Sequence, residues 1–93
     1  MPKYFVIHPF DKKVQEAMVS LPPEKNQLLK QLKANCTDDA DWVRSWAVPE
    51  LEKFYCEWDA KSPEAIREIF DKIGGTAIDA IYEMHVLEGE AYK

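Results

Sequence analysis

The 93-residue chain is long enough for one domain, residues 1–93, and its 46% apolar content is typical of a globular rather than a disordered protein. The formal net charge of −5, without a basic stripe, argues against nucleic acids and anionic membranes as partners. No secretory leader or long apolar run occurs, and Cys36 and Cys56 lack metal-finger or redox spacing. We therefore expect a cytoplasmic protein with two reduced thiols.

The first predicted strand covers residues 3–8 and ends at Pro9, because proline cannot donate a hydrogen bond to a sheet. Side chains alternate across a strand and divide it into two faces. One face carries Phe5 and Ile7, and the other carries Tyr4, Val6 and His8. We assign the face with Tyr4 and His8 to the uncovered side of the sheet.

A helical region follows between residues 11 and 35, and two prolines interrupt it. Residues 11–21 have helical apolar spacing but run into Pro22 and Pro23, so we expect a short helix or a turn there. A better helix is predicted from about residue 23 to residue 35, with proline in its first turn and Glu24 near its positive end.

Residues 41–60 predict a β-hairpin, since two runs of aromatic and β-branched residues flank Pro49-Glu50. With a two-residue loop, the expected pairs are Trp46–Lys53, Ser45–Phe54, Arg44–Tyr55, Val43–Cys56 and Trp42–Glu57. The face under the helices would carry Val43, Ser45, Ala47, Phe54, Cys56 and Trp58. The uncovered face would carry Trp42, Arg44, Trp46, Lys53, Tyr55 and Glu57.

The chain closes with a helix and a strand. Ser62-Pro63 is a helix start, a stripe at residues 66, 69, 70 and 73 gives the helix an apolar side, and Gly74-Gly75 ends it. Residues 78–87 predict the last strand, with Ile81, Glu83, His85 and Leu87 on one face.

The element order β-α-β-β-α-β predicts a ferredoxin-like α+β domain. Both helices then cover one face of a four-stranded antiparallel sheet whose first and third strands are central. The other face would expose an aromatic patch of Tyr4, Trp42, Trp46 and Tyr55, which is typical of an interface. We therefore expect a homodimer in which two sheets enclose a cavity, as in a dimeric α+β barrel.

Three consecutive motifs resemble a small, mostly uncharacterised family of the dimeric α+β-barrel superfamily. They are Trp42-Val43-Arg44-Ser45-Trp46, the strand from Phe54 to Ala60, and the capped helix start from Ser62 to Glu68. One branch of that family is described as nickel-binding. The resemblance implies the dimeric barrel and, as cofactor, nickel or another divalent metal.

The candidate metal ligands are His8 and His85 on the first and last predicted strands, with Glu57 or Glu83 completing the shell. Imidazole and carboxylate groups together suit a divalent transition metal such as nickel or zinc. The alternative interpretation is that both histidines are hydrogen-bonded residues of a dimer interface.

A small-molecule cavity is the second candidate site, lined by Tyr4, Trp42, Arg44, Trp46, Tyr55 and Glu57. Arg44 between two indoles could hold a carboxylate or a planar ligand, or could simply pair with Glu57. A cofactor-free isomerase, cyclase or monooxygenase would use His8 as acid/base and Arg44 as anion holder. The aromatic face could also serve dimerisation alone.

Two further expectations concern chemistry that the sequence does not favour. No nucleotide-cofactor fingerprint is present. Cys56 is expected to be a buried thiol beneath the helices, without a histidine on its face that could activate it.

Overall fold

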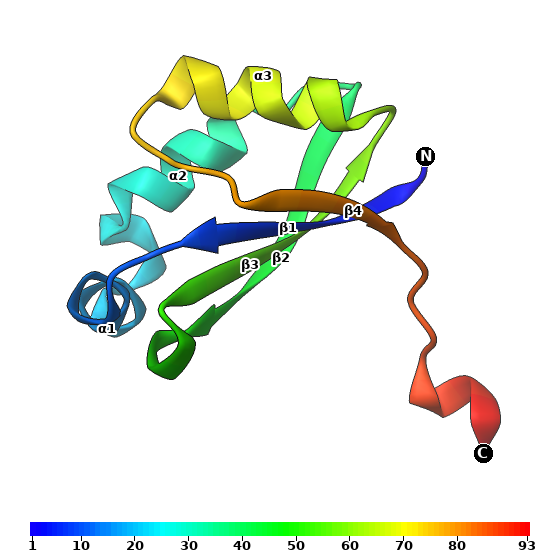
Figure 1. Ribbon diagram of the computed structural model, residues 1–93, viewed down its shortest axis with the longest axis horizontal. Coiled ribbons are helices and arrows are strands. Elements are labelled where there is room, and N and C mark those ends of the chain that lie inside the picture. The colour runs from blue at the N-terminus through cyan, green and yellow to red at the C-terminus, as the bar shows by residue number, and fades with distance from the viewer.

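The computed structural model describes residues 1–93 and contains a four-stranded antiparallel sheet in the order β2-β3-β1-β4. The strands are β1 (Lys3–Pro9), β2 (Ala40–Val48), β3 (Lys53–Ala60) and β4 (Ala80–Met84), and the helices are α1 (Lys12–Ser20), α2 (Gln27–Ala34) and α3 (Pro63–Ile73). Figure 1 shows α2 and α3 on one side of the sheet, with the opposite side uncovered. The predicted ferredoxin-like α+β fold is confirmed, and so is the central position of β1 and β3.

Helix α3 forms as its sequence predicts. The Ser62 hydroxyl accepts a hydrogen bond from the backbone N–H of Ala65 at 3.2 Å, and Pro63 takes the first helical position. Gly74 ends the helix with a backbone φ of 75°, a conformation that residues with a Cβ atom rarely adopt. The helix is thereby fixed at both ends, and its apolar stripe faces the sheet.

The helical region before the hairpin is divided more finely than predicted. Asp11 caps α1 by accepting hydrogen bonds from two backbone N–H groups, and Pro23–Lys25 form only a 3₁₀ turn, η1. Asn26 then leaves the helical conformation and caps α2 by accepting from the N–H of Leu29 at 3.2 Å. The second helix therefore starts at Gln27 instead of residue 23, because the asparagine side chain competes for the helix amides.

The hydrophobic core lies between the sheet and the helices. Its buried apolar members come from β1, α2, β2, β3 and α3, and they are Tyr4, Val6, Leu32, Ala40, Phe54, Cys56, Trp58, Ala60, Ile66, Ile69 and Phe70. The predicted stripe of α3 thus supplies three of the core residues, and β3 supplies four. These two elements carry most of the packing that holds the helices on the sheet.

The hairpin between β2 and β3 has a four-residue connection instead of the predicted two. Residues 49–51 form a 3₁₀ turn, and Glu52 closes it in the left-handed conformation with a φ of 52°. Two extra loop residues move each pair along by two, so Trp46 lies opposite Tyr55 and Arg44 opposite Glu57. A shift of two residues preserves the face of a side chain, so the predicted faces of β3 and of β2 from Arg44 onward are correct despite the wrong register.

A β-bulge at Val43 changes the face of the residue before it. Arg44 lies opposite Glu57, whereas Trp42 lies opposite Trp58, so β2 holds one residue more than β3 between these pairs. The extra residue reverses the alternation, and Trp42 packs against the core beneath the helices. The prediction that Trp42 shares the uncovered face with Arg44 and Trp46 is therefore wrong.

The two faces of β1 are also reversed relative to the prediction. Tyr4 lies opposite Trp58 and His8 opposite Phe54, in register with the helix side of β3, and both are buried. Glu83 lies opposite Tyr4 and shares that side. Both faces of a central strand carry apolar residues, so the alternation in β1 does not tell which face the helices cover.

Candidate functional site

The uncovered side of the sheet carries an aromatic patch, as predicted, but with a different membership. The ring of Phe5 stacks on Tyr55 at a centroid distance of 5.2 Å and lies 6.3 Å from Trp46. We call this surface the open-face patch; its residues are Phe5, Ile7, Trp46, Tyr55, Tyr82 and Met84. Trp46 and Tyr82 are both exposed to solvent. Of the predicted cavity residues, Trp46, Tyr55, Arg44 and Glu57 lie on this side of the sheet, whereas Tyr4 and Trp42 do not.

A cluster of charges borders the open-face patch. Glu57 is buried and lies 2.7 Å from the Lys3 ammonium and 3.1 Å from Arg44 Nε, while Lys3 also contacts Asp59 at 2.8 Å. The hydrogen bond to Asp59, and to a smaller extent the one to Glu57, raises the pKa of Lys3. The two cations Lys3 and Arg44 thus already neutralise the Glu57 carboxylate. This arrangement matches the structural interpretation of Arg44 and leaves Glu57 poorly available to a metal.

His8 lies on the helix side of the sheet and is only 1% exposed. Its Nδ1 is 2.9 Å from the carbonyl oxygen of Ala77, which can only accept, so Nδ1 carries the proton of a neutral ring. Burial lowers the pKa of His8. The other nitrogen, Nε2, is buried without a hydrogen-bond partner, and the ring of Phe70 lies 4.7 Å away. His8 is therefore a neutral core histidine.

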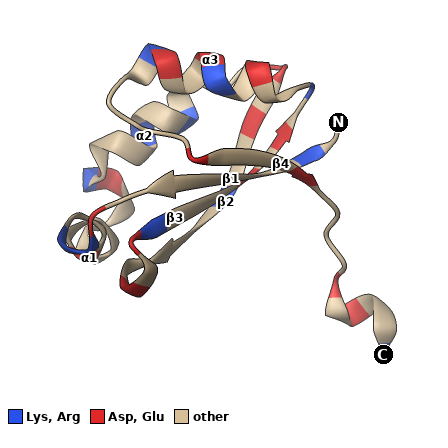
Figure 2. Ribbon diagram, viewed as in Figure 1, with Lys and Arg blue, Asp and Glu red and all other residues tan.

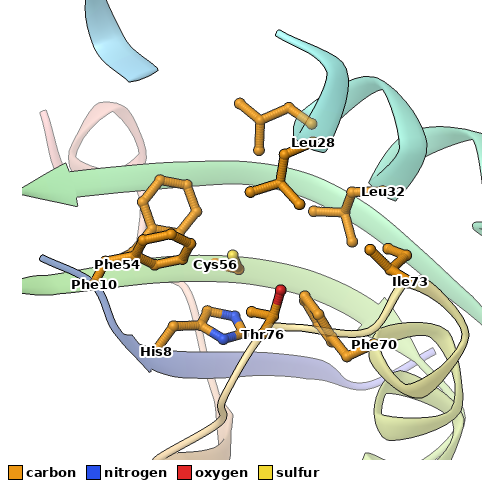
Figure 3. Close-up of a pocket in the computed structure, with 10 residues that line it drawn as sticks. His8, Phe10, Leu28, Leu32, Phe54, Cys56, Phe70, Ile73 and Thr76 are labelled. Carbon is orange, nitrogen blue, oxygen red and sulfur yellow. The ribbon is translucent and has the colours of Figure 1, made fainter. Parts of the chain in front are cut away.

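A small apolar cavity of about 10 Å³ lies beside His8, which is room for about one water molecule. Figure 3 shows its lining, in which His8, Cys56, Phe70 and Thr76 come together beneath α2. Cys56 thus does share a face with a histidine, contrary to the prediction. Burial nevertheless raises the pKa of the Cys56 thiol to about 11, so it is protonated at neutral pH and the expectation of a buried, unreactive thiol holds.

The spacing of Trp42 and Ser45 in the hairpin motif has a structural role in this chain. The indole Nε1–H of Trp42 donates to the Ser45 hydroxyl at 2.8 Å, and that hydroxyl donates to the Cys56 sulfur at 3.1 Å. This chain of hydrogen bonds joins β2 to β3 and fixes the orientation of the Trp42 ring. These residues of the motif therefore stabilise the hairpin.

His85 lies just beyond β4, far from His8. Antiparallel pairing places Met84 opposite Lys3 and Ala80 opposite Ile7, so the two histidines lie toward opposite ends of β1. The His85 side chain is 85% exposed, and its Nε2 lies 3.8 Å from Glu83 Oε2. No group of three or more histidine, cysteine or carboxylate side chains comes together anywhere in the chain. The four predicted ligands therefore do not form one site within a single chain.

His8 and Arg44 also lie on opposite sides of the sheet, because Arg44 pairs with Glu57 on the open face. The two side chains cannot reach one substrate from these positions. The enzymatic alternative therefore lacks a common site for its acid/base and its anion holder.

The burial of neutral His8 predicts a pH-dependent stability. The unfolded chain takes up a proton on this residue near its ordinary pKa of 6.5, whereas the folded protein does so only at lower pH. The contribution of His8 to the free energy of unfolding should therefore be constant above pH 6.5. As the pH falls below 6.5, this contribution should decrease by at most about 1.4 kcal/mol per pH unit. Urea unfolding between pH 7.5 and 5 measures this slope. His8→Phe should remove it and His85→Ala should keep it; equal slopes in all three proteins would contradict the assignment.

Comparison with known proteins identifies a family and a solved structure that resemble this chain. Residues 4–84 match the protein family described as nickel responsive protein, SCO4226-like. The crystal structure of SCO4226 from Streptomyces coelicolor A3(2) matches 92% of this chain and 99% of its own, with a TM-score of 0.65 and 18% sequence identity. At 18% sequence identity, the structural similarity to SCO4226 establishes the fold alone. None of the curated proteins matches the chain. No helix combines the length and apolar character that crossing a bilayer requires.

Proposed function

The chain belongs to the SCO4226-like family of nickel responsive proteins, and from this membership we propose that it is a cytoplasmic homodimer that binds a divalent metal, nickel foremost. The family match over residues 4–84 is the observation that carries the proposal. It covers all three helices and all four strands except Lys3 at the start of β1, so the proposal concerns the domain as a whole.

The pair Glu83 and His85 is the best-supported part of a metal site. An imidazole and a carboxylate oxygen lie 3.8 Å apart, both are exposed, and neither makes a closer ion pair. These are donors that nickel and zinc accept. Of the other predicted ligands, His8 has its free nitrogen sealed in the core, and Glu57 is held by two cations. We therefore assign metal binding to Glu83 and His85.

Two donors from one chain leave the coordination sphere incomplete, since transition metals in proteins take four or more ligands. A second copy of the chain would supply another imidazole and another carboxylate. We infer a site shared between two chains at the exposed end of the edge strand β4, beyond which His85 lies, with one metal ion per dimer. Binding of metal would then favour the dimer, because the metal binds the assembled form more tightly than the single chain.

The open-face patch supports the dimer independently of the metal. A side of the sheet with stacked aromatic rings and no helix above it exposes a contiguous apolar surface of the kind that marks protein interfaces. Covering it with the same patch of a second chain satisfies the two-fold symmetry of a homodimer. The charges of Lys3, Glu57 and Arg44 would form the polar border of that contact.

Calorimetric titration of nickel into protein stripped with chelator tests the metal site. We expect saturation at one nickel per two chains, no stoichiometric binding by His85→Ala, and binding weakened about tenfold or more by Glu83→Gln. His8→Phe is the matched control and should bind like the wild type. Affinity should fall at acid pH, because protons compete with the metal for imidazole.

The titration separates the two parts of the proposal. Wild-type protein without specific binding of nickel or zinc defeats the metal assignment, whatever its oligomeric state. Binding by His85→Ala equal to that of the wild type would show that the ligands lie elsewhere. Sedimentation of the metal-free protein reports on the dimer separately.

A further inference from the structure

A second hollow lies on the helix side of the sheet, away from both the open-face patch and the Glu83–His85 pair. We call it the α2 groove, and its volume of about 420 Å³ falls in the range of small-molecule sites. Its lining residues are Met18, Leu21, Pro23, Asn26, Leu29, Lys30, Lys33 and Trp42. They come from the end of α1, the η1 turn, α2 and the start of β2.

One wall of the α2 groove is the Trp42 ring, which the bulge at Val43 turns to this side. The hydrogen bond from Trp42 Nε1 to Ser45 holds the indole in one orientation. Met18 and Leu29 line the groove with the ring. The walls therefore form a preorganised apolar slot suited to an aromatic or branched aliphatic group.

The polar groups of the α2 groove are hydrogen-bond donors. Asn26 is only 6% exposed, and its Oδ1 is occupied in capping α2, while its Nδ2 amide makes no hydrogen bond within the protein. The Lys30 ammonium contacts only the Glu24 carbonyl oxygen, at 3.3 Å. Asn26 is the N-cap of α2 and Lys30 lies in its first turn, so both are near the helix N-terminus, where the helix dipole adds positive potential.

The electrostatics of the groove are opposite in sign to those of the whole protein. The chain carries 17 acidic residues and a net charge of −5, yet no aspartate or glutamate lines the α2 groove. Lys33 is paired with Asp41 at 2.8 Å, which leaves Lys30 as the unpaired cation of the lining. Figure 2 shows the basic positions of α2 in blue. The groove offers hydrogen-bond donors, and the carbonyl oxygen of the Asn26 side chain already accepts a hydrogen bond from the Leu29 N–H, so the groove favours an anion.

We propose that the α2 groove binds a small organic carboxylate with an aromatic or branched apolar body. The carboxylate would accept hydrogen bonds from Asn26 Nδ2 and the Lys30 ammonium, and the apolar body would lie against Trp42 and Leu29. The site uses none of the residues assigned to metal binding or to the dimer contact, so it stands or falls independently of both.

The probe for this site is 4-phenylbutyrate, compared with 4-phenylbutyramide and 4-phenylbutylamine, which have the same ring and chain but no negative charge. Titration is followed by ¹H–¹⁵N correlation spectra of the full chain. The carboxylate should shift the Asn26 side-chain amide and the Trp42 indole signals saturably, with a Kd on the order of 1 mM for so small a probe. The amide and the amine should bind at least about tenfold more weakly.

Asn26→Asp is the decisive variant, because aspartate keeps the helix cap but replaces the free amide donor with a negative charge. It should abolish binding of 4-phenylbutyrate while leaving the melting temperature equal or higher. Lys30→Gln should weaken binding about tenfold, whereas Lys72→Gln on α3, the matched control, should not. Absence of saturable shifts in the wild type, equal binding of the amine, or unchanged binding in Asn26→Asp would each overturn the proposal.

Discussion

Replacing Phe5 with arginine is expected to convert the proposed open-face dimer into a monomer at micromolar concentration. Phe5 lies at the centre of the open-face patch, stacked on Tyr55 and close to Trp46, and it neighbours the cation of Lys3 on the same side of the strand. An additional cation there would be buried when two patches meet, and the Glu57 carboxylate opposite it is already paired with Lys3 and Arg44. The dimer Kd should rise at least about 30-fold, as for the central residue of an interface.

Sedimentation velocity across about 1 to 100 µM chain measures this change, a range in which protein complexes of ordinary affinity dissociate. The matched control is Val19→Arg, which places the same charge at an exposed position of α1 on the helix side. The control should remain dimeric, and far-ultraviolet circular dichroism should show both variants folded. A wild-type protein that sediments as a monomer throughout this range would refute the open-face dimer.

The substitution Ile69→Ala is expected to lower the free energy of unfolding by about 2–5 kcal/mol, since it leaves a cavity in a closely packed core. Ile69 is 2% exposed on the inner side of α3, and its helix is fixed at both ends. The helix therefore cannot rotate to fill the space. Urea unfolding of the metal-free protein measures the effect, with exposed Glu68→Ala as the neighbouring control.

Glu68→Ala should change the free energy of unfolding by no more than about 0.5 kcal/mol, as is usual for exposed surface positions. A loss at Ile69 as small as this would mean that α3 presents another face to the sheet. Because Ile69 was assigned to the apolar stripe from sequence spacing alone, the same measurement tests that assignment.

Local signals were sufficient to predict α3 and the order of the elements. A capping serine, a proline at the first helical position and an apolar stripe all indicate the same helix, and the structure contains it from Pro63 to Ile73. The order of strands then follows from the ferredoxin-like topology, which leaves few alternatives. Agreement between several independent local signals is what made these predictions hold.

The faces of β1 could not be predicted because both of its alternating sets are apolar. From the sequence we assign His8 to the uncovered side, but a single carbonyl, that of Ala77, satisfies its Nδ1–H and allows burial on the helix side. For Trp42, one extra residue in β2 reversed the face, and nothing in the residues around Val43 distinguishes a bulge from a regular strand. Both failures concern which side of a strand is covered, and long-range packing decides this.

The structure does not bring His8 and His85 together. Their predicted strands are neighbours in the sheet, but neighbouring strands bring two residues together only when the register pairs them, and here it places the two histidines toward opposite ends of β1. Sequence reasoning also missed the α2 groove. The one signal for it in the sequence is Asn26 ahead of an apolar run. This pattern indicates a helix cap, but it does not indicate that the Nδ2 group of the Asn26 side chain makes no hydrogen bond.

The position of β1 at the centre of the sheet has a consequence for how the protein folds. β1 is the first strand to leave the ribosome, yet its partners come much later, since Lys3 pairs with both Asp59 and Met84. The hairpin of β2 and β3 can close locally, whereas β1 must wait for it, and such long-range pairing slows folding. Until then Phe5, Val6 and Ile7 remain exposed on both faces of an unpaired strand. Nascent chains that pause before residue 60 are thus the form of this protein with the greatest need of chaperone protection.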